Sequence, residues 1–263
     1  MARPDGRDPA VLRSDRAFVA FSWYLRWYLS RRFRAVRVAM DGLPSQALGR
    51  PMVVYSNHPS WWDPAFYMVM AAMLFPGRRG FGPMDEQSLG RYGVLERMGV
   101  FGIDIASPRG AARFLRVSRR LLDDPRNMMW ITAEGTFVDA RTRPVALRPG
   151  VAHLVRLHPG TVVLPLALEY TFWNESRPEA LARFGLPVAI PADATVSETT
   201  SLLTAELTRT MDALQAASAR RDPRQFRTLV RGTAGVGGIY DLYRRGRAVV
   251  ARQRFDPTHG GQP

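Results

Sequence analysis

Residues 53–63 read Val-Val-Tyr-Ser-Asn-His-Pro-Ser-Trp-Trp-Asp and contain the change of pattern on which the predicted fold depends. An apolar run rich in β-branched and aromatic residues ends at Asn57, and an apolar helical pattern begins at Pro64. The stretch therefore predicts a strand, a short loop and a helix. His58 then lies at the carboxyl end of the strand, where open α/β sheets hold their ligands. Pro59 disfavours helical backbone at His58, which places the imidazole in the loop.

Asp63 follows His58 by five residues and directly precedes Pro64. This order is typical of a helix N-cap followed by the first helical residue. A carboxylate at this position can fold back onto the imidazole, accept a hydrogen bond from one ring nitrogen and leave the other nitrogen free as a base. The same residues also suit a plain helix cap beside a surface histidine. The spacing alone does not decide between these two interpretations.

The composition is that of one globular domain with basic ends. At 263 residues and 46% hydrophobic content, the chain can bury a full core. No apolar run approaches the ~18 residues of a spanning helix, and the polar first ten residues contain no secretory signal. The absence of cysteine excludes disulfides, thiolate metal sites and a cysteine nucleophile.

Most of the formal net charge of +14 lies in the two flanks of the sequence. Residues 1–40 contain nine Arg and three Asp, which gives +6, and residues 222–263 contain eight Arg and three Asp, which gives +5. Such segments are attracted both to anionic membranes and to nucleic acids.

A helix is predicted from Asp15, with Ser22, Arg26 and Ser30 along a narrow polar face. Its remaining surface is aromatic and leucine-rich, and an arginine cluster follows at residues 31–37. Aromatic bulk with flanking arginines is typical of a helix lying in a membrane interface. A helix docked on the core fits the pattern equally well, and one helix can do both.

The remaining elements are predicted from periodicity and turn residues. Residues 76–82 indicate a loop, and the proline within the strand at 161–168 indicates a sheet edge or a bulge. Further strands are expected at 100–105, 127–133 and 186–190, and helices at 88–98, 110–122, 150–157, 178–184 and 196–219. Residues 222–255 have a mostly helical, basic pattern.

Asn57-His58-x4-Asp63, with Ser60 inside it, resembles the first motif of the 1-acylglycerol-3-phosphate acyltransferase family of glycerolipid acyltransferases. The resemblance implies that His58 is the general base on the acceptor hydroxyl and that Asp63 orients it. A second motif of that family is matched by Gly99, Ile103 and Asp104. Two positions depart from it, because Gly102 stands where an aromatic residue is usual and Ile105 where an arginine is usual.

Residues 133–137, Ala-Glu-Gly-Thr-Phe, resemble the third family motif, Pro-Glu-Gly-Thr-Arg, and Pro165 resembles the fourth. The resemblance implies that Glu134, Gly135 and Thr136 bind the acceptor. A carboxylate can accept a hydrogen bond from a hydroxyl, and glycine allows a close approach to the backbone. Phe137 replaces the usual arginine. We take Arg109 and Arg141 as the candidate phosphate-binding residues. Arg143 and Arg148 in the same loop as Arg141 could also substitute, although a basic solvated loop explains all three loop arginines.

The four motifs occur in the family's order and together cover roughly residues 51–168. The implied fold is a single α/β domain with a central mixed, largely parallel sheet flanked by helices. We expect an N-terminal amphipathic membrane-interface segment at 1–40, an acyltransferase domain at 41–221, and a basic C-terminal helical segment and tail at 222–263.

The implied reaction is direct transfer of a fatty acyl group from acyl-CoA or an acyl carrier protein thioester to a lysophospholipid such as lysophosphatidic acid. No metal or bound cofactor is expected. We expect a peripheral location on the anionic cytoplasmic face of the cell membrane and no nucleic-acid partner. Two alternatives stay open: a lyso-aminolipid or glycolipid acceptor that lacks a phosphate, and a basic nucleic-acid-binding protein.

Overall fold

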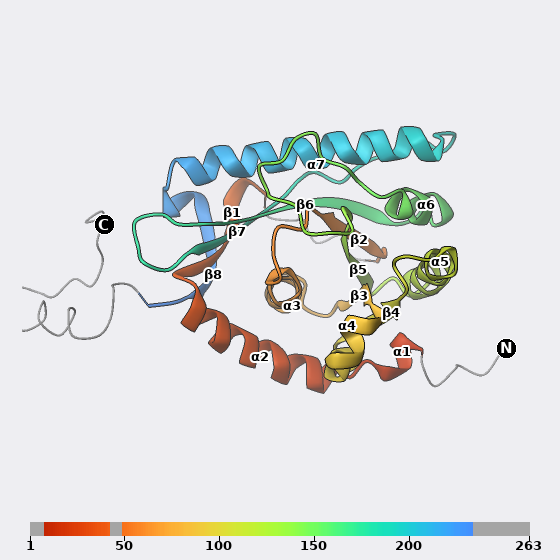
Figure 1. Ribbon diagram of the computed structural model, residues 1–263, viewed down its shortest axis with the longest axis horizontal. Coiled ribbons are helices and arrows are strands. Elements are labelled where there is room, and N and C mark those ends of the chain that lie inside the picture. Colours follow the sequence, from red (N-terminus) through yellow and green to blue (C-terminus); the bar gives the residue numbers. More distant parts are fainter. Residues whose placement is uncertain (1–7, 43–48, 234–263) are drawn as a thin grey trace, which may run out of the picture.

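The computed structural model describes residues 8–42 and 49–233, and its central feature is an eight-stranded mixed sheet (Figure 1). The strand order is β4-β3-β5-β2-β6-β7-β1-β8. The strands are β1 (Ala35–Ala39), β2 (Met52–Ser56), β3 (Arg79–Asp85), β4 (Val100–Ile103), β5 (Asn127–Thr132), β6 (Val162–Thr171), β7 (Glu179–Phe184) and β8 (Phe226–Arg231).

The five strands from β4 to β6 are parallel to one another, and β7 is also parallel to β1. Only the β6–β7 and β1–β8 pairs within the described sheet are antiparallel. The predicted α/β fold with a mixed, largely parallel sheet is confirmed. Because parallel strands end at the same edge, the residues that follow β4, β3, β5 and β2 all lie along one side of the sheet.

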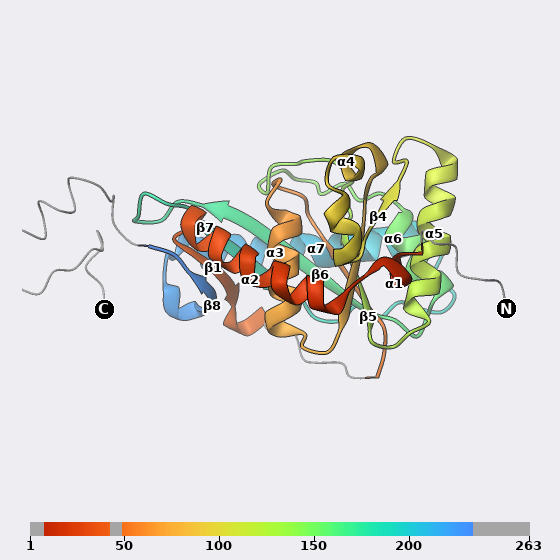
Figure 2. The same ribbon diagram turned by 90° about the horizontal axis from the view of Figure 1, so that it is seen from below.

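Helices cover both faces of the sheet (Figures 1 and 2). On one face lie α2 (Asp15–Arg32) and α3 (Asp63–Leu74), and on the other lie α5 (Pro108–Leu122), α6 (Gly150–Leu157) and α7 (Val196–Ala219). The shorter helices are α1 (Pro9–Leu12), α4 (Glu86–Arg91) and the 3-10 turns η1 (Met40–Gly42), η2 (Gly93–Met98) and η3 (Pro223–Gln225).

The sheet separates two apolar clusters, as the alternation of side chains along β2 shows. Met52 and Val54 point into the cluster with α2 and α3, whereas Val53 and Tyr55 point into the cluster with α5, α6 and α7. All four are buried, so β2 is a continuous apolar run rather than an alternating one.

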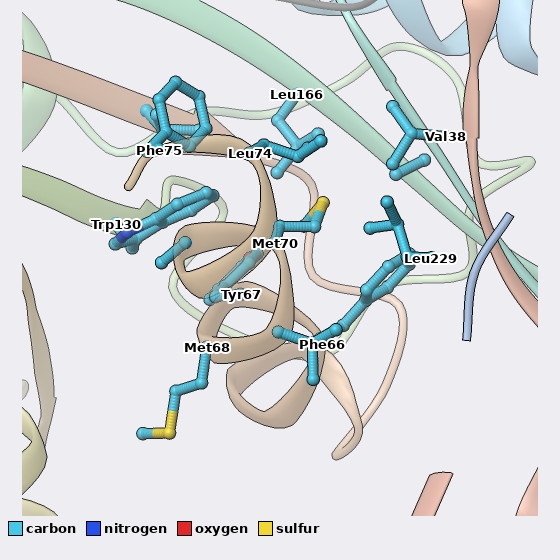
Figure 3. Packing of buried hydrophobic residues seen from close by; sticks show 14 of the residues in the cluster. Val38, Phe66, Tyr67, Met68, Met70, Leu74, Phe75, Trp130, Leu166 and Leu229 are labelled. Atoms are coloured by element: carbon cyan, nitrogen blue, oxygen red, sulfur yellow. The ribbon is translucent and has the colours of Figure 1, made fainter. Parts of the chain in front are cut away.

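Helix α3 is apolar around its whole circumference because it lies between the sheet and α2. Figure 3 shows its side chains among those of the surrounding strands. Phe66 lies beside Leu229 of β8 in this view, and the Tyr67 ring stacks on Trp130 of β5 with 5.3 Å between the ring centroids. The helix that carries Asp63 is therefore held rigidly against the sheet.

Helix α2 is docked on the core, and its orientation differs from the predicted one. Ser22 of the expected polar face is buried and bonds its own helix at Val19 O (2.7 Å). The inward face consists of small and aliphatic residues together with Phe18, and the larger aromatic residues point outward. Within residues 8–42 and 49–233, no helix combines the length and apolarity needed to cross a bilayer.

Four predicted elements are wrong, and three of these segments contain strands that pair with distant parts of the chain. The predicted loop at 76–82 contributes to β3, and the predicted helix at 178–184 is strand β7. Glu179 hides the strand pattern of β7, since this buried carboxylate accepts a 2.9 Å hydrogen bond from Arg37 of β1. The predicted strand at 186–190 is a loop that touches β6 through one bond, Val188 N to Val163 O (2.8 Å).

The fourth wrong prediction is the helical pattern at 222–255. Residues 226–231 of this segment form β8, which is antiparallel to β1. Residues 234–263 lie outside the described residues. The flanks of the sequence thus supply two strands, β1 and β8, to the common sheet.

The prediction that Pro165 marks a sheet edge or a bulge is wrong for its strand, since β6 lies between β2 and β7. The pairing with β7 ends at Leu166 and Phe184. The Pro165 carbonyl then accepts a bond from Gly185 N (2.9 Å) beyond the end of β7. Because N and O of one residue point to the same side of a strand, proline removes only the second bond of this last pair, where the β6–β7 pairing ends.

Candidate active site

His58 and Glu134 meet because they follow two adjacent parallel strands. His58 lies two residues after the end of β2, and Glu134 lies two residues after the end of β5. The ladder continues one residue past the end of β5 through a bond from Ala133 N to Ser56 O (2.9 Å). The Glu134 carboxylate then accepts the backbone N–H of His58 at 2.7 Å. Two of the predicted motifs thus form one site at the carboxyl edge of the sheet.

Asp63 contacts the imidazole of His58 as predicted, with 2.6 Å between Oδ2 and Nδ1. It is not the N-cap of α3, because Trp62 occupies that position and Asp63 is the first helical residue. Besides the imidazole, its Oδ2 atom accepts a longer bond from the backbone N–H of Ser60 (3.3 Å). The carboxylate is therefore committed to the histidine, and holding Nδ1 leaves Nε2 as the nitrogen able to accept a proton.

The other oxygen of Asp63 has a partner that the sequence did not reveal. The Tyr170 hydroxyl at the carboxyl end of β6 donates a 2.7 Å hydrogen bond to Asp63 Oδ1. Asp63 is 0% exposed, so its carboxylate depends on these protein donors for solvation. A tyrosine two residues beyond the predicted end of a strand at 161–168 was the available signal.

Burial acts on the pKa values of both carboxyl groups of the site. Loss of solvent raises the pKa of Asp63, while the hydrogen bonds from His58 and Tyr170 act against that rise. The pKa of Glu134 is raised by burial as well, and its bond from the His58 backbone N–H opposes the rise. The site therefore contains two carboxyl groups that are stabilised by particular donors rather than by water.

Asn57 fixes the loop that carries the histidine. Its side-chain amide donates to Leu168 O (2.9 Å) and accepts from Leu168 N (2.8 Å). Asn57 thereby replaces a strand residue in the β2–β6 ladder just where β2 ends. This role was not predicted, since the partner lies 111 residues away in the sequence.

The third motif forms a turn against the histidine loop. Gly135 has a φ of 69°, and a Cβ atom there would lie 2.4 Å from Arg148 Nε, so two constraints require glycine. Thr136 is exposed, and the Phe137 ring lies 4.4 Å from the His58 ring between centroids while remaining 59% exposed. The turn is held by a bond from Val138 N to His58 O (3.0 Å).

The two predicted phosphate-binding arginines lie in different surroundings. Arg141 is paired with Asp139 at 2.7 Å on the exposed loop after β5. Arg109 is exposed in the first turn of α5, which follows β4, and β3 separates β4 from β5 in the sheet. No group of three or more His, Asp or Glu side chains in the described part of the chain is arranged to hold a metal ion.

Comparisons with known proteins agree with this geometry. The sequence model of a family described as Acyltransferase matches residues 35–169, just over half of the chain. No protein with a curated function shows a significant match. Among solved structures, the crystal structure of the 1-acyl-sn-glycerophosphate (LPA) acyltransferase PlsC from Thermotoga maritima is similar, with a TM-score of 0.51 and 15% sequence identity. The similarity covers 82% of this chain and 85% of that chain, and it shows a shared fold.

Proposed function

The chain belongs to the acyltransferase family, and on this basis we propose that it transfers a fatty acyl group from an acyl thioester to the hydroxyl of a lysophospholipid. The donor is a thioester of coenzyme A or of acyl carrier protein. One observation carries the proposal: Nδ1 of His58 lies 2.6 Å from the fully buried carboxylate of Asp63, so Nε2 is the nitrogen left to act as a base.

In the proposed reaction, His58 Nε2 takes the proton of the acceptor hydroxyl as the hydroxyl oxygen attacks the thioester carbonyl. Asp63 keeps the proton on Nδ1 and stabilises the imidazolium that forms. The carbon–sulfur bond then breaks, and the thiolate leaves with the electron pair and receives the proton from His58. General-base assistance of this kind contributes about 10² to 10⁴ in rate. A thiol with a pKa of ~8.5 leaves with little help from an acid.

The remaining predicted site residues support this chemistry from the turn after β5. We propose that Glu134 positions His58 through the backbone N–H that it accepts (2.7 Å). Gly135 and Thr136 are proposed to contact the acceptor, because the Thr136 side chain is exposed and Gly135 beside it is partly exposed.

Substitution of His58 tests the mechanism most directly. His58→Ala should lower kcat by about 10² to 10⁴ with an unchanged circular dichroism spectrum. Its unfolding midpoint should fall, because the buried Asp63 carboxylate loses the imidazole as a partner. Asp63→Asn should also lose most of its activity, because asparagine cannot stabilise an imidazolium. His153→Ala, which removes a histidine on α6, is the matched control and should keep wild-type activity. A well-folded His58→Ala protein with wild-type turnover would disprove the mechanism.

We propose a peripheral position on the anionic cytoplasmic face of the cell membrane, and the outward face of α2 supports the contact with a membrane surface. Its exposed apolar residues are between 49% and 64% accessible; they are Val19, Trp23, Tyr24 and Trp27. Arg26 and Arg31 lie 4.9 and 5.1 Å from the ring centroids of Trp23 and Trp27. Aromatic rings flanked by guanidinium groups suit the boundary between headgroups and acyl chains.

The aromatic surface continues from α2 to the active site. Tyr24 stacks on Tyr28 at 5.9 Å, Tyr28 contacts Trp62 at 5.7 Å, and Trp62 contacts Trp61 at 5.4 Å, all between ring centroids. Trp61 is 61% exposed and lies three residues after His58 in the sequence. We propose that this continuity brings the site to lipid substrates at the bilayer surface.

Vesicle binding distinguishes this proposal from the nucleic-acid alternative. A Trp23→Ser/Trp27→Ser double variant should lose most sedimentation with anionic vesicles, while Phe172→Ser, which removes an exposed aromatic residue elsewhere, should not. Unchanged sedimentation of the double variant would show that α2 only docks on the core. Tight DNA binding by the wild type, without vesicle binding, would favour the other class of protein.

A second class of acceptor is favoured by the apolar residues near the site. Phe137 lies against His58, and Ile105 is 48% exposed, at the two positions where the resemblance implies arginines. A lyso-aminolipid or glycolipid without a phosphate would suit such surroundings. The ratio of kcat/KM for an acceptor with a phosphate to that for an acceptor without one decides between the two classes of acceptor.

A further inference from the structure

Arg148, which precedes α6, lies at the meeting point of the loops that follow β4 and β5. Its Nη1 atom donates a 3.3 Å hydrogen bond to the carbonyl of Ile105, and its backbone N–H bonds Ala133 O at 2.9 Å. Its Nε and Cδ atoms pass directly over Gly135, in the space that a Cβ atom there would occupy. The side chain thus connects the two motifs in which an arginine is missing.

The arginines of the segment after Glu134 differ in whether a carboxylate neutralises them. Arg141 is paired with Asp139 and Arg143 with Asp212, both at 2.7 Å. Arg148 is exposed and forms no ion pair with any carboxylate in residues 8–42 and 49–233. Of the five guanidinium N–H groups, the bond to Ile105 uses one, so the others are available to an anion.

Arg148 is also connected to the catalytic histidine by a short series of contacts. The guanidinium covers Gly135, Gly135 follows Glu134, and the Glu134 carboxylate binds the His58 backbone N–H at 2.7 Å. An anionic group bound by Arg148 would lie beside the turn after β5, whose residues Gly135 and Thr136 are proposed to contact the acceptor. The glycine and the Ile105 carbonyl fix the guanidinium in place without a carboxylate partner.

We infer that Arg148 is the residue that binds the phosphate of the acceptor and so determines its class. The assignment rests on the proposed acyl transfer. It replaces the sequence-based candidates Arg109 and Arg141, and it makes the apolar residues Ile105 and Phe137 compatible with a phosphorylated acceptor. The planar guanidinium matches two phosphate oxygens, a geometry that a lysine ammonium does not reproduce.

The test compares two acceptors that differ only in the phosphate: lysophosphatidic acid and the monoacylglycerol with the same acyl chain, each presented in neutral mixed micelles. For the wild type we expect a higher kcat/KM with lysophosphatidic acid. Arg148→Ala should lower that value by about ten- to a hundredfold, mainly through KM, and leave monoacylglycerol within about twofold. Arg148→Lys should recover part of the loss. Arg148→Gln retains bulk over Gly135 and a donor for Ile105, and should behave like Arg148→Ala.

Arg116→Ala on the exposed side of α5 removes the same charge and should change neither acceptor. Equal losses for both acceptors in Arg148→Gln would overturn the assignment. A phosphate-specific loss in Arg109→Ala or Arg141→Ala, with Arg148→Gln unaffected, would overturn it as well. A wild-type protein that acylates neither acceptor from either thioester donor would instead disprove the proposed function, and with it this inference.

Discussion

The Tyr170 hydroxyl donates a 2.7 Å hydrogen bond to Oδ1 of Asp63, the carboxylate whose Oδ2 atom lies 2.6 Å from His58 Nδ1. Burial and the nearby carboxylate raise the pKa of Tyr170 well above its usual value, so the phenol stays protonated and can act as a donor. The pair joins β6 to the first residue of α3. Tyr170 of β6 therefore positions the Asp63 carboxylate, which in turn contacts His58.

Tyr170→Phe should impair the site without removing the ring contacts of Tyr170 with Phe33 and Phe66, at 5.8 and 6.4 Å. One oxygen of the buried Asp63 loses its donor, which costs about 1–3 kcal/mol in unfolding free energy. Because that bond lowers the pKa of Asp63, its loss should raise this pKa further. The acid limb of the kcat/KM profile should then move to higher pH.

Tyr67→Phe is the matched control for that experiment. It removes another buried phenol of the same cluster, whose hydroxyl bonds Ser56 rather than Asp63. Its stability should fall, but the acid limb should stay in place. The same profile for Tyr170→Phe and the wild type would mean that Tyr170 contributes packing only.

Asn57→Ala should be among the most destabilising substitutions in the site. It leaves both backbone groups of Leu168 without the partners seen at 2.9 and 2.8 Å, in a buried position. Two such losses cost about 2–6 kcal/mol together, measured by urea unfolding. Asn57→Asp keeps the acceptor but places a buried carboxylate oxygen against the Leu168 carbonyl, and should be at least as destabilising as Asn57→Ala at neutral pH. A loss below about 0.5 kcal/mol for Asn57→Ala would mean that water replaces the amide.

Glu134→Gln should change the pH dependence of stability. Burial raises the pKa of Glu134, so the folded protein binds this proton more tightly than the unfolded chain does. That contribution is fully present below the ordinary carboxyl pKa and is lost as the pH rises through the raised pKa.

Glutamine does not titrate, and its amide oxygen can still accept the His58 N–H. The stability of Glu134→Gln relative to the wild type should therefore increase from about pH 4 to about pH 7, by about 1.4 kcal/mol for each unit of elevation. Urea unfolding at both pH values measures this difference. A difference that decreases with pH would mean that the folded protein favours the ionised carboxylate.

The parts of the site that the sequence predicted are local. His58 and Asp63 are five residues apart. Pro59 indicates the loop that carries His58, and Pro64 indicates the start of the helix at Asp63. Helix α7 was likewise predicted with its observed bounds, 196–219, from its apolar periodicity. Its start is fixed locally, because Thr195 and Glu198 form a capping box.

The parts that sequence reasoning missed depend on distant partners. Tyr170 lies 107 residues from Asp63 along the chain. Strand β7 is buried between β6 and β1. It can bury the Glu179 carboxylate only because Arg37 of β1 forms an ion pair with it. A local pattern reports which side of a segment avoids water, and it does not report what the segment pairs with.

Gly135→Ala should reveal two separable costs, since the residue has a φ of 69° and its new Cβ atom would lie 2.4 Å from Arg148 Nε. The backbone strain alone costs about 1–3 kcal/mol. Displacement of the Arg148 side chain adds to it, so the double variant Gly135→Ala/Arg148→Ala should lose less stability than the sum of its single variants. Gly160→Ala, with open space around the new methyl group and no positive φ, is the control and should be nearly neutral in urea unfolding. Strict additivity of the two substitutions would mean that Arg148 moves away from Gly135 at no cost and is not held there.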